Sequence, residues 1–162
     1  MLPRVSYRCH GQEAAMPTRK FREEHDRILR QASAIAGLAN GRMTRDAADE
    51  ARAAILGLDR LLVEHLTAED EWMYPLLMAS PDESVRGAAT ECFGDMGGIR
   101  GAWDAYRELW TSEAILEAPI RFRAATDGVI GALAMRVERE NVELYPLVDH
   151  MSPLPAEEDQ AA

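Results

Sequence analysis

Two short stretches of the chain carry the residue types best suited to chemistry, and both follow one pattern. Residues 65–75 read HLTAEDEWMYP and residues 136–146 read RVERENVELYP; we call them the first and second Tyr-Pro stretch. In each, a glutamate (Glu69 or Glu140) stands six residues before the proline. His65 stands four residues before Glu69, a spacing that puts both side chains on one helical face, one turn apart. Such a His-x-x-x-Glu pair can offer two ligands to one metal ion.

The second Tyr-Pro stretch differs where the first has its histidine. Arg136 stands four residues before Glu140, as His65 does before Glu69. An arginine keeps its positive charge in a protein interior, so it needs carboxylate partners there. The sequence therefore raises the question of whether a metal site at these residues is complete, reduced to one ion or absent.

The surrounding sequence is typical of long amphipathic helices. Apolar residues recur at steps of three and four, and no segment alternates with the period of two that strands require. Turn and capping residues divide the chain into four segments: Pro17-Thr18 to Asn40-Gly41, Thr44 to Tyr74-Pro75, Ser80-Pro81-Asp82 to Ser112, and Pro119 to Tyr145-Pro146. Short connections favour antiparallel neighbours. We therefore predict an all-α fold, an up-down-up-down antiparallel four-helix bundle.

The same spacing predicts which face of each helix points inward. The predicted seams comprise Phe21, His25, Ile28, Ala32 and Ile35; Ala51, Ile55, Leu58, Leu62, His65, Glu69 and Trp72; Val85, Ala89, Cys92, Met96, Ile99, Trp103, Tyr106 and Trp110; and Phe122, Ala125 or Thr126, Val129, Leu133, Arg136 and Glu140. The second and fourth helices run in the same direction in such a bundle, so Glu69 and Glu140 lie at one level. We expect His25, His65 and Arg136 to meet them there, because buried charged groups need partners.

Composition excludes several classes of function. The chain has 162 residues, enough for one domain with a sizeable core, and a net charge of −10. An acidic chain lacks the basic face that nucleic acids and anionic membranes require, so neither is expected as a partner. We find neither an apolar run long enough for a membrane span nor the apolar stretch of a secretory signal. Cys9 and Cys92 form no Cys-x-x-Cys pattern and cannot make a disulfide framework, so a cytoplasmic location is predicted.

The chain ends differ in composition from the helical part. Residues 1–16 have no clear period and are predicted to form a loose N-terminal arm. Residues 17–152 form the predicted bundle. Residues 153–162, PLPAEEDQAA, are predicted to be a disordered acidic tail.

Taken together, these motifs resemble those of the hemerythrin-like family, the HHE cation-binding domains. The family pattern has a histidine on the first helix, His-x-x-x-Glu on the second, a histidine on the third, and His-x-x-x-Glu or a close variant on the fourth. Phe-Arg-Glu-Glu-His25 matches the first motif, and the first Tyr-Pro stretch matches the second. The resemblance covers about residues 18–150. It implies a four-helix bundle around two non-haem irons bridged by two carboxylates, in proteins that bind oxygen, nitric oxide or iron, or sense redox state.

Two positions depart from the family pattern. Met96 stands where the third helix would carry its histidine, and Arg136 replaces the histidine of the fourth helix. In the family, the ligands of these two helices serve mainly one of the irons. The resemblance therefore implies that one metal position is lost and that the other is spared. The residues of the spared position are His25, His65, Glu69 and Glu140.

Two interpretations remain open from the sequence. In the first, His25, His65, Glu69 and Glu140 bind a single divalent cation such as iron, zinc or manganese, and the protein takes part in metal or redox sensing or handling rather than oxygen carriage. In the second, Arg136 replaces the charge of the metal, one histidine carries a proton, and the metal-free bundle is an interaction or regulatory module.

Catalytic machinery is not evident in the sequence. It contains no nucleophile beside a base and no glycine-rich phosphate loop, so no enzymatic activity is predicted apart from what a bound metal would supply. We expect Met96 to fill the core rather than bind a metal, and Cys92 to be a buried thiol. Protein partners and oligomeric state are not specified by these residues.

Overall fold

The computed structural model describes residues 18–151, except for the side chains of Asp95, Met96 and Met151. This part of the chain is helical apart from short turns and contains no strand. Its elements are α1 (Thr18–Asn40), α2 (Arg45–Ala68), η1 (Glu69–Met73), α3 (Tyr74–Met78), α4 (Glu83–Met96), α5 (Ile99–Leu109), α6 (Ser112–Glu117), α7 (Pro119–Arg139), η2 (Glu140–Leu144) and α8 (Tyr145–Met151), where η1 and η2 are π-helical turns. The predicted arm of residues 1–16 and the predicted tail of residues 153–162 lie outside the described residues.

Capping side chains set the helix starts that the sequence predicts. Thr44 is the N-cap of α2, where its hydroxyl accepts the backbone N–H of Ala47 at 3.2 Å. Asp82 caps α4 in the same way, accepting the N–H of Ser84 at 2.8 Å. Each cap satisfies an N–H group that would otherwise lack a partner at the first turn.

The predicted third helix is divided. It ends at Met96 as α4 and resumes at Ile99 as α5, with a turn at Gly97 and Gly98 between them. Two successive glycines have low helix propensity because they lose the most backbone freedom on folding. A short extra helix, α6, then begins at Ser112, where the prediction placed only a helix end.

Neither Tyr-Pro stretch ends its helix, contrary to the bounds predicted from the prolines. The chain continues through η1 into α3 and through η2 into α8. The backbone N–H of Tyr74 donates to the carbonyl of Glu69, five residues earlier, and Tyr145 donates in the same way to Glu140. A proline ring inside an α-helix meets the carbonyl four residues back, and the wider π turn just before it relieves that contact.

Each π turn also shifts the inward face of the helix by one residue. In the first stretch Met73 is completely buried, whereas Trp72, predicted to lie on the seam, is 41% exposed. The prediction for Trp72 was wrong because it continued the α-helical spacing through a turn that holds an extra residue. On the last predicted seam, Thr126 rather than Ala125 is buried.

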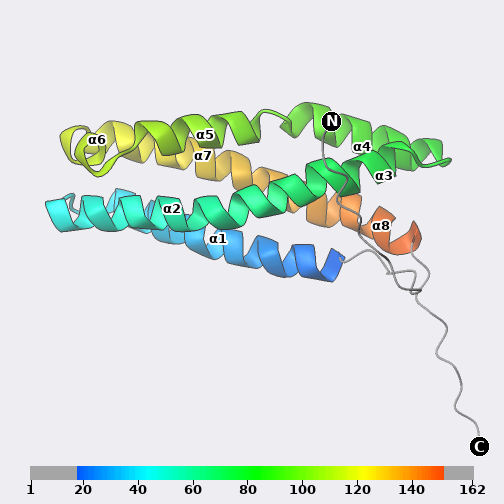
Figure 1. Ribbon diagram of the computed structural model, residues 1–162, viewed down its shortest axis with the longest axis horizontal. Helices are drawn as coiled ribbons and strands as arrows, with labels where there is room; N and C mark the ends of the chain where they lie inside the picture. The colour runs from blue at the N-terminus through cyan, green and yellow to red at the C-terminus, as the bar shows by residue number, and fades with distance from the viewer. Residues whose placement is uncertain (1–17, 152–162) are drawn as a thin grey trace, which may run out of the picture.

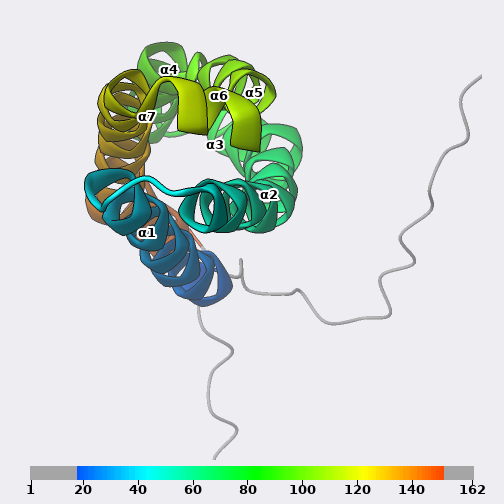
Figure 2. The ribbon, with the colours of Figure 1, turned by 90° about the vertical axis from the view of Figure 1, so that its left-hand side faces the viewer.

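The long helices surround a common centre, as the end-on view in Figure 2 shows. α1 packs against α2 and α7, and α5 packs against both α2 and α7, so these four close a ring. α3 and α4 lie together at the end where α8 finishes (Figure 1). None of the described helices is long and apolar enough to cross a membrane.

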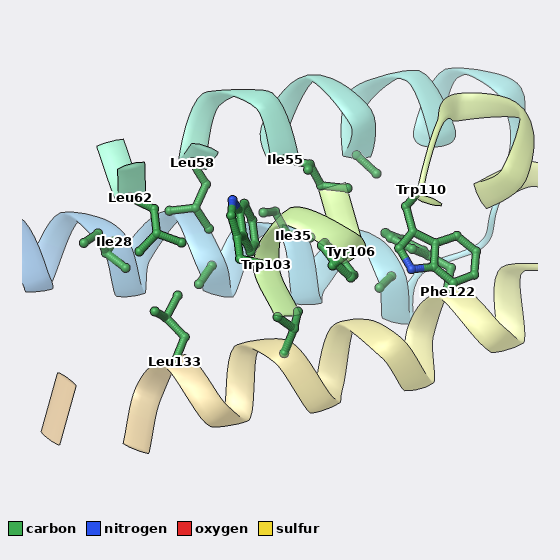
Figure 3. Close-up of a cluster of buried hydrophobic side chains, with 14 of the residues drawn as sticks. Ile28, Ile35, Ile55, Leu58, Leu62, Trp103, Tyr106, Trp110, Phe122 and Leu133 are labelled. Carbon is green, nitrogen blue, oxygen red and sulfur yellow. The ribbon is translucent and has the colours of Figure 1, made fainter. Parts of the chain in front are cut away.

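Buried apolar side chains form two separate clusters. The larger lies between α1, α2, α5, α6 and α7 and contains the aromatic residues Trp103, Tyr106, Trp110 and Phe122 (Figure 3). The smaller lies at the other end, among Phe21, Met73, Tyr145 and their neighbours on α4 and α8. On α1, His25 stands between Phe21 of the smaller cluster and Ile28 of the larger one. Glu69 and Glu140 likewise stand between larger-cluster residues of α2 and α7 and the smaller-cluster residues Met73 and Leu144.

Candidate metal centre

The structure brings the five polar residues predicted for one layer of the core into contact. His25 comes from α1, His65 from the last turn of α2, and Arg136 from the last turn of α7. Glu69 and Glu140 are the first residues of η1 and η2. All five side chains are buried. Because each glutamate begins a π turn, the two Tyr-Pro stretches present equivalent carboxylates to the same layer.

Four of these residues can direct one ligand atom each at a common point. The ligand atoms of His25, His65, Glu69 and Glu140 all lie within 4.8 Å of one another. His25 Nε2 is 3.3 Å from Glu140 Oε2, and His65 Nε2 is 3.3 Å from Glu69 Oε1. His25 Nε2 also lies 3.8 Å from Glu69 Oε1. Two imidazoles and two carboxylates therefore converge in the interior.

Both imidazole rings are oriented by acceptors on their far side. His25 Nδ1 lies 3.0 Å from Asn141 Oδ1, and His65 Nδ1 lies 2.9 Å from Glu24 Oε2. An acceptor at Nδ1 places the ring proton there and leaves the Nε2 lone pair directed at the centre of the layer. Histidines that bind metals in proteins are held in this way.

Two buried atoms at the centre lack a hydrogen-bond partner among the residues that the structure describes. They are His65 Nε2 and Glu140 Oε2. An unsatisfied buried polar atom is costly, and each of these two atoms has a lone pair that a cation can accept. The donor set therefore fits a divalent cation bound between the histidines and the two carboxylates.

Arg136 contacts the remaining carboxylate oxygens. Its Nε donates to Glu140 Oε1 at 2.8 Å, and its Nη2 donates to Glu69 Oε2 at 3.0 Å. Each carboxylate thus has one oxygen on the guanidinium and the other on the histidine side. Burial alone would lower the pKa of Arg136, but Glu140 and Glu69 outweigh this and raise it, so the side chain stays charged.

The family is decided by a match along most of the chain. A family model described as the hemerythrin HHE cation-binding domain matches residues 16–148. The chain belongs to this family. No curated protein and no solved structure is similar enough to match it. The predicted resemblance is therefore confirmed, and the HHE domain accounts for the described helices and for the His/Glu group in their core.

The charges in this HHE domain interact strongly. Burial works to raise the pKa of Glu69, but His65, Arg136 and the Tyr145 hydroxyl outweigh it and lower the pKa to about 2. Burial likewise works to lower the pKa of His65, but the carboxylates of Glu69, Glu24 and Glu140 raise it above the ordinary 6.5. The raised pKa favours the protonated form of His65, and a metal ion at His65 Nε2 would compete with that proton.

Four described residues that hydrogen-bond to the site were not predicted from the sequence. The Tyr74 hydroxyl donates to Glu140 Oε1 at 2.9 Å, and the Tyr145 hydroxyl donates to Glu69 Oε1 at 2.7 Å. The others are the histidine acceptors Glu24 and Asn141. A signal for the tyrosines was present, because both belong to the repeated Tyr-Pro stretches.

The two remaining sequence predictions concern the third predicted helix. Cys92 is a buried thiol, as predicted, with its Sγ 3.6 Å from Glu143 Oε2, and burial raises its pKa to about 11. Met96 is the last residue of α4, but its side chain is not among those described. Its predicted role as core filler remains a prediction, and Cys9 lies outside the described residues.

Proposed function

We propose that this HHE domain binds one divalent metal ion through His25, His65, Glu69 and Glu140. The observation that carries the proposal is the pair of buried, unpartnered atoms, His65 Nε2 and Glu140 Oε2, within a group of four ligand atoms no more than 4.8 Å apart. A set of two imidazoles and two carboxylates suits iron, zinc or manganese.

The position of Arg136 favours one ion over two. Its guanidinium occupies the carboxylate oxygens that a second ion would need. The fully buried carboxylates Glu69 and Glu140 bring two negative charges to the site, and Arg136 already balances one of them. The partly exposed Glu24 contacts both His65 and Lys20, so one dication suffices to balance the layer. A second dication would add an excess of positive charge in a buried layer, where unbalanced charge is costly.

A site for a single ion favours a function in sensing or handling metal ions, or in sensing or handling redox changes. Reversible oxygen carriage, in which oxygen takes one electron from each of two irons, does not fit a one-ion site. A bound iron or manganese would supply one-electron redox chemistry, and a zinc would act as a Lewis acid. The protein's own residues orient the imidazoles through Asn141 and Glu24 and exclude water from the layer by burial. We also propose that the four long helices follow the up-down-up-down topology predicted from the sequence. The cytoplasmic location remains a prediction.

Metal content tests the proposal directly. Protein purified without chelator is expected to contain close to one equivalent of metal, measured by elemental analysis, and a His65→Ala variant is expected to lose it. His150→Ala is the matched control, because His150 is an exposed histidine whose Nδ1 contacts the carbonyl of Pro146. A protein that contains no metal, and whose melting temperature is unchanged by added iron, zinc or manganese, would contradict the proposal.

A second candidate is the metal-free bundle in which Arg136 replaces the charge of the metal. The two hydrogen bonds from Arg136 to Glu69 and Glu140 favour it, as does the raised pKa of His65. One guanidinium and one imidazolium neutralise the two carboxylates without an ion. In that case the layer serves stability only, and the domain acts through its surface as an interaction or regulatory module.

A further inference from the structure

The two Tyr-Pro stretches contact each other crosswise. Tyr74, from the first stretch, donates its hydroxyl to Glu140 of the second at 2.9 Å. Tyr145, from the second stretch, donates its hydroxyl to Glu69 of the first at 2.7 Å. Both tyrosines are buried. The backbone N–H of each tyrosine meanwhile bonds the carbonyl of the glutamate in its own stretch. Each tyrosine thus holds the backbone of one glutamate and the carboxylate of the other.

We propose that Tyr74 and Tyr145, the crossed tyrosines, are positioning residues that orient the carboxylates of Glu140 and Glu69 toward the metal ion. The inference rests on the single-metal function proposed above. A carboxylate can rotate about its terminal bonds, and a donor on one oxygen fixes which lone pairs face the ion. Each hydroxyl supplies such a donor from a neighbouring helix, so the orientation is set before the ion arrives.

The two tyrosines are not equivalent. Glu140 Oε1 accepts from both Tyr74 and Arg136 Nε, so it keeps a donor when Tyr74 is changed. Glu69 Oε1 accepts the Tyr145 hydroxyl at 2.7 Å, and the nearest histidine nitrogen, His65 Nε2 at 3.3 Å, is itself a proposed ligand. Loss of the Tyr145 hydroxyl therefore frees a ligand oxygen, whereas loss of the Tyr74 hydroxyl does not.

Tyr145 also contacts one of the histidines. Its ring stacks on His25 with the ring centroids 5.2 Å apart and an interplanar angle of 14°. Its hydroxyl lies 3.2 Å from His25 Nε2. Tyr145 therefore touches two of the four proposed ligands and Tyr74 only one, which makes Tyr145 the more important of the pair.

Phenylalanine substitutions separate positioning from packing, since they remove the hydroxyl and keep the ring. Tyr106→Phe is the matched control, because Tyr106 is a buried tyrosine of the larger apolar cluster whose hydroxyl pairs with Thr126 Oγ1 at 2.7 Å. The dissociation constant for Zn²⁺ is measured by competition with a chromophoric chelator. Loss of a residue that orients a ligand typically weakens metal binding by about 10–100-fold. We expect Tyr145→Phe to raise the Zn²⁺ dissociation constant by the same factor, about 10–100-fold. Tyr74→Phe is expected to weaken binding by about two- to tenfold, and Tyr106→Phe by less than about twofold.

Bound Co²⁺ provides a readout that general loosening of the fold does not change. Its visible absorption depends on the geometry of the ligands, so the band is expected to shift in Tyr145→Phe and to stay in place in Tyr106→Phe. Circular dichroism reports whether each variant folds. If Tyr145→Phe does not fold, Tyr74→Phe takes its place. It is expected to weaken Zn²⁺ binding by about two- to tenfold, because Glu140 loses Tyr74 and keeps Arg136 as a donor. A Zn²⁺ affinity and Co²⁺ band equal to those of the Tyr106→Phe control would overturn the inference.

The results distinguish this inference from the function on which it rests. If the wild-type protein binds one metal ion and Tyr145→Phe binds it equally well with the same Co²⁺ band, the positioning role is refuted and the metal site stands. If Tyr106→Phe loses as much affinity as Tyr145→Phe, the effect is not positioning and the inference fails. A wild-type protein that binds neither Zn²⁺ nor Co²⁺ overturns both.

Discussion

Replacement of Arg136 by methionine tests the electrostatics of the buried layer most directly. Methionine keeps much of the volume of the side chain and removes its charge. Arg136 is 4% exposed, and its two hydrogen bonds go to the carboxylates of Glu69 and Glu140, both completely buried. The substitution therefore leaves two carboxylates side by side without a cation.

The size of the effect follows from these contacts. A hydrogen bond to a charged group contributes about 1.5–3 kcal/mol, so the two together contribute about 3–6 kcal/mol. Removal of one partner from a buried ion pair costs about 3–5 kcal/mol, an estimate of the same effect rather than an addition to it. We expect Arg136→Met to lower the free energy of unfolding by about 3–5 kcal/mol, a large part of the roughly 5–15 kcal/mol of a typical domain.

Urea unfolding in the presence of a chelator is the assay, with the fluorescence of the three tryptophans as the signal. Arg107→Met is the control, because Arg107 also contacts carboxylates, among them Asp59 at 3.3 Å, but its side chain is 31% exposed. That substitution is expected to cost less than about 1 kcal/mol. Zn²⁺ at about 100 times its dissociation constant is expected to restore about 2.7 kcal/mol to Arg136→Met. A loss below about 1 kcal/mol for Arg136→Met in chelator would refute the reasoning, since the carboxylates would then not depend on the arginine.

Three further predictions concern other parts of the molecule. Asn141→Ala is expected to raise the Zn²⁺ dissociation constant about 10–100-fold in a competition titration, because His25 Nδ1 loses its acceptor; an unchanged constant would contradict this role. In a Cys9→Ser background, Cys92 is expected to react slowly with iodoacetamide at pH 8 and faster as the pH approaches its pKa of about 11. The folded state holds the thiol proton more tightly than the unfolded state, so the free energy of unfolding is expected to fall as the pH rises from about 9 toward 11. Alkylation of the folded protein at pH 8 as fast as that of the protein in urea would argue against a raised pKa of Cys92. Ile55→Ala, at a completely buried position, is expected to lower the free energy of unfolding by about 2–5 kcal/mol in thermal or urea unfolding. Its neighbour Leu56 is 40% exposed, so Leu56→Ala is expected to lower it by about 0.5 kcal/mol. Equal losses for the two variants would disprove the assigned core.

Local chemistry made much of the fold predictable. The caps at Thr44 and Asp82 depend on side chains a few residues from the N–H groups that they satisfy, so the sequence alone identifies them. The inward positions of α1 and α5 follow from the α-helical period, which holds without interruption inside each helix. The convergence of His25 with His65 was predictable for a related reason, because buried polar groups on facing seams need each other as partners.

The predictions failed where the backbone leaves the α-helical period. The π turns moved Met73 inward in place of Trp72, and nothing in the residue types distinguishes a proline that ends a helix from one that follows a π turn. The hydrogen bond from Tyr145 to Glu69 spans 76 residues in sequence, so it could be identified only in three dimensions.

The polar layer between the two apolar clusters has a consequence for cooperativity. Apolar packing couples the residues within each cluster, whereas the layer between them is held by a few charged contacts, chief among them those of Arg136. The amide hydrogens of α3, α4 and α8 are therefore expected to exchange more readily than those of the larger cluster. An ion bound between α1, α2 and the two π turns would add bonds across this layer, so metal binding is expected to protect α3, α4 and α8 from that exchange.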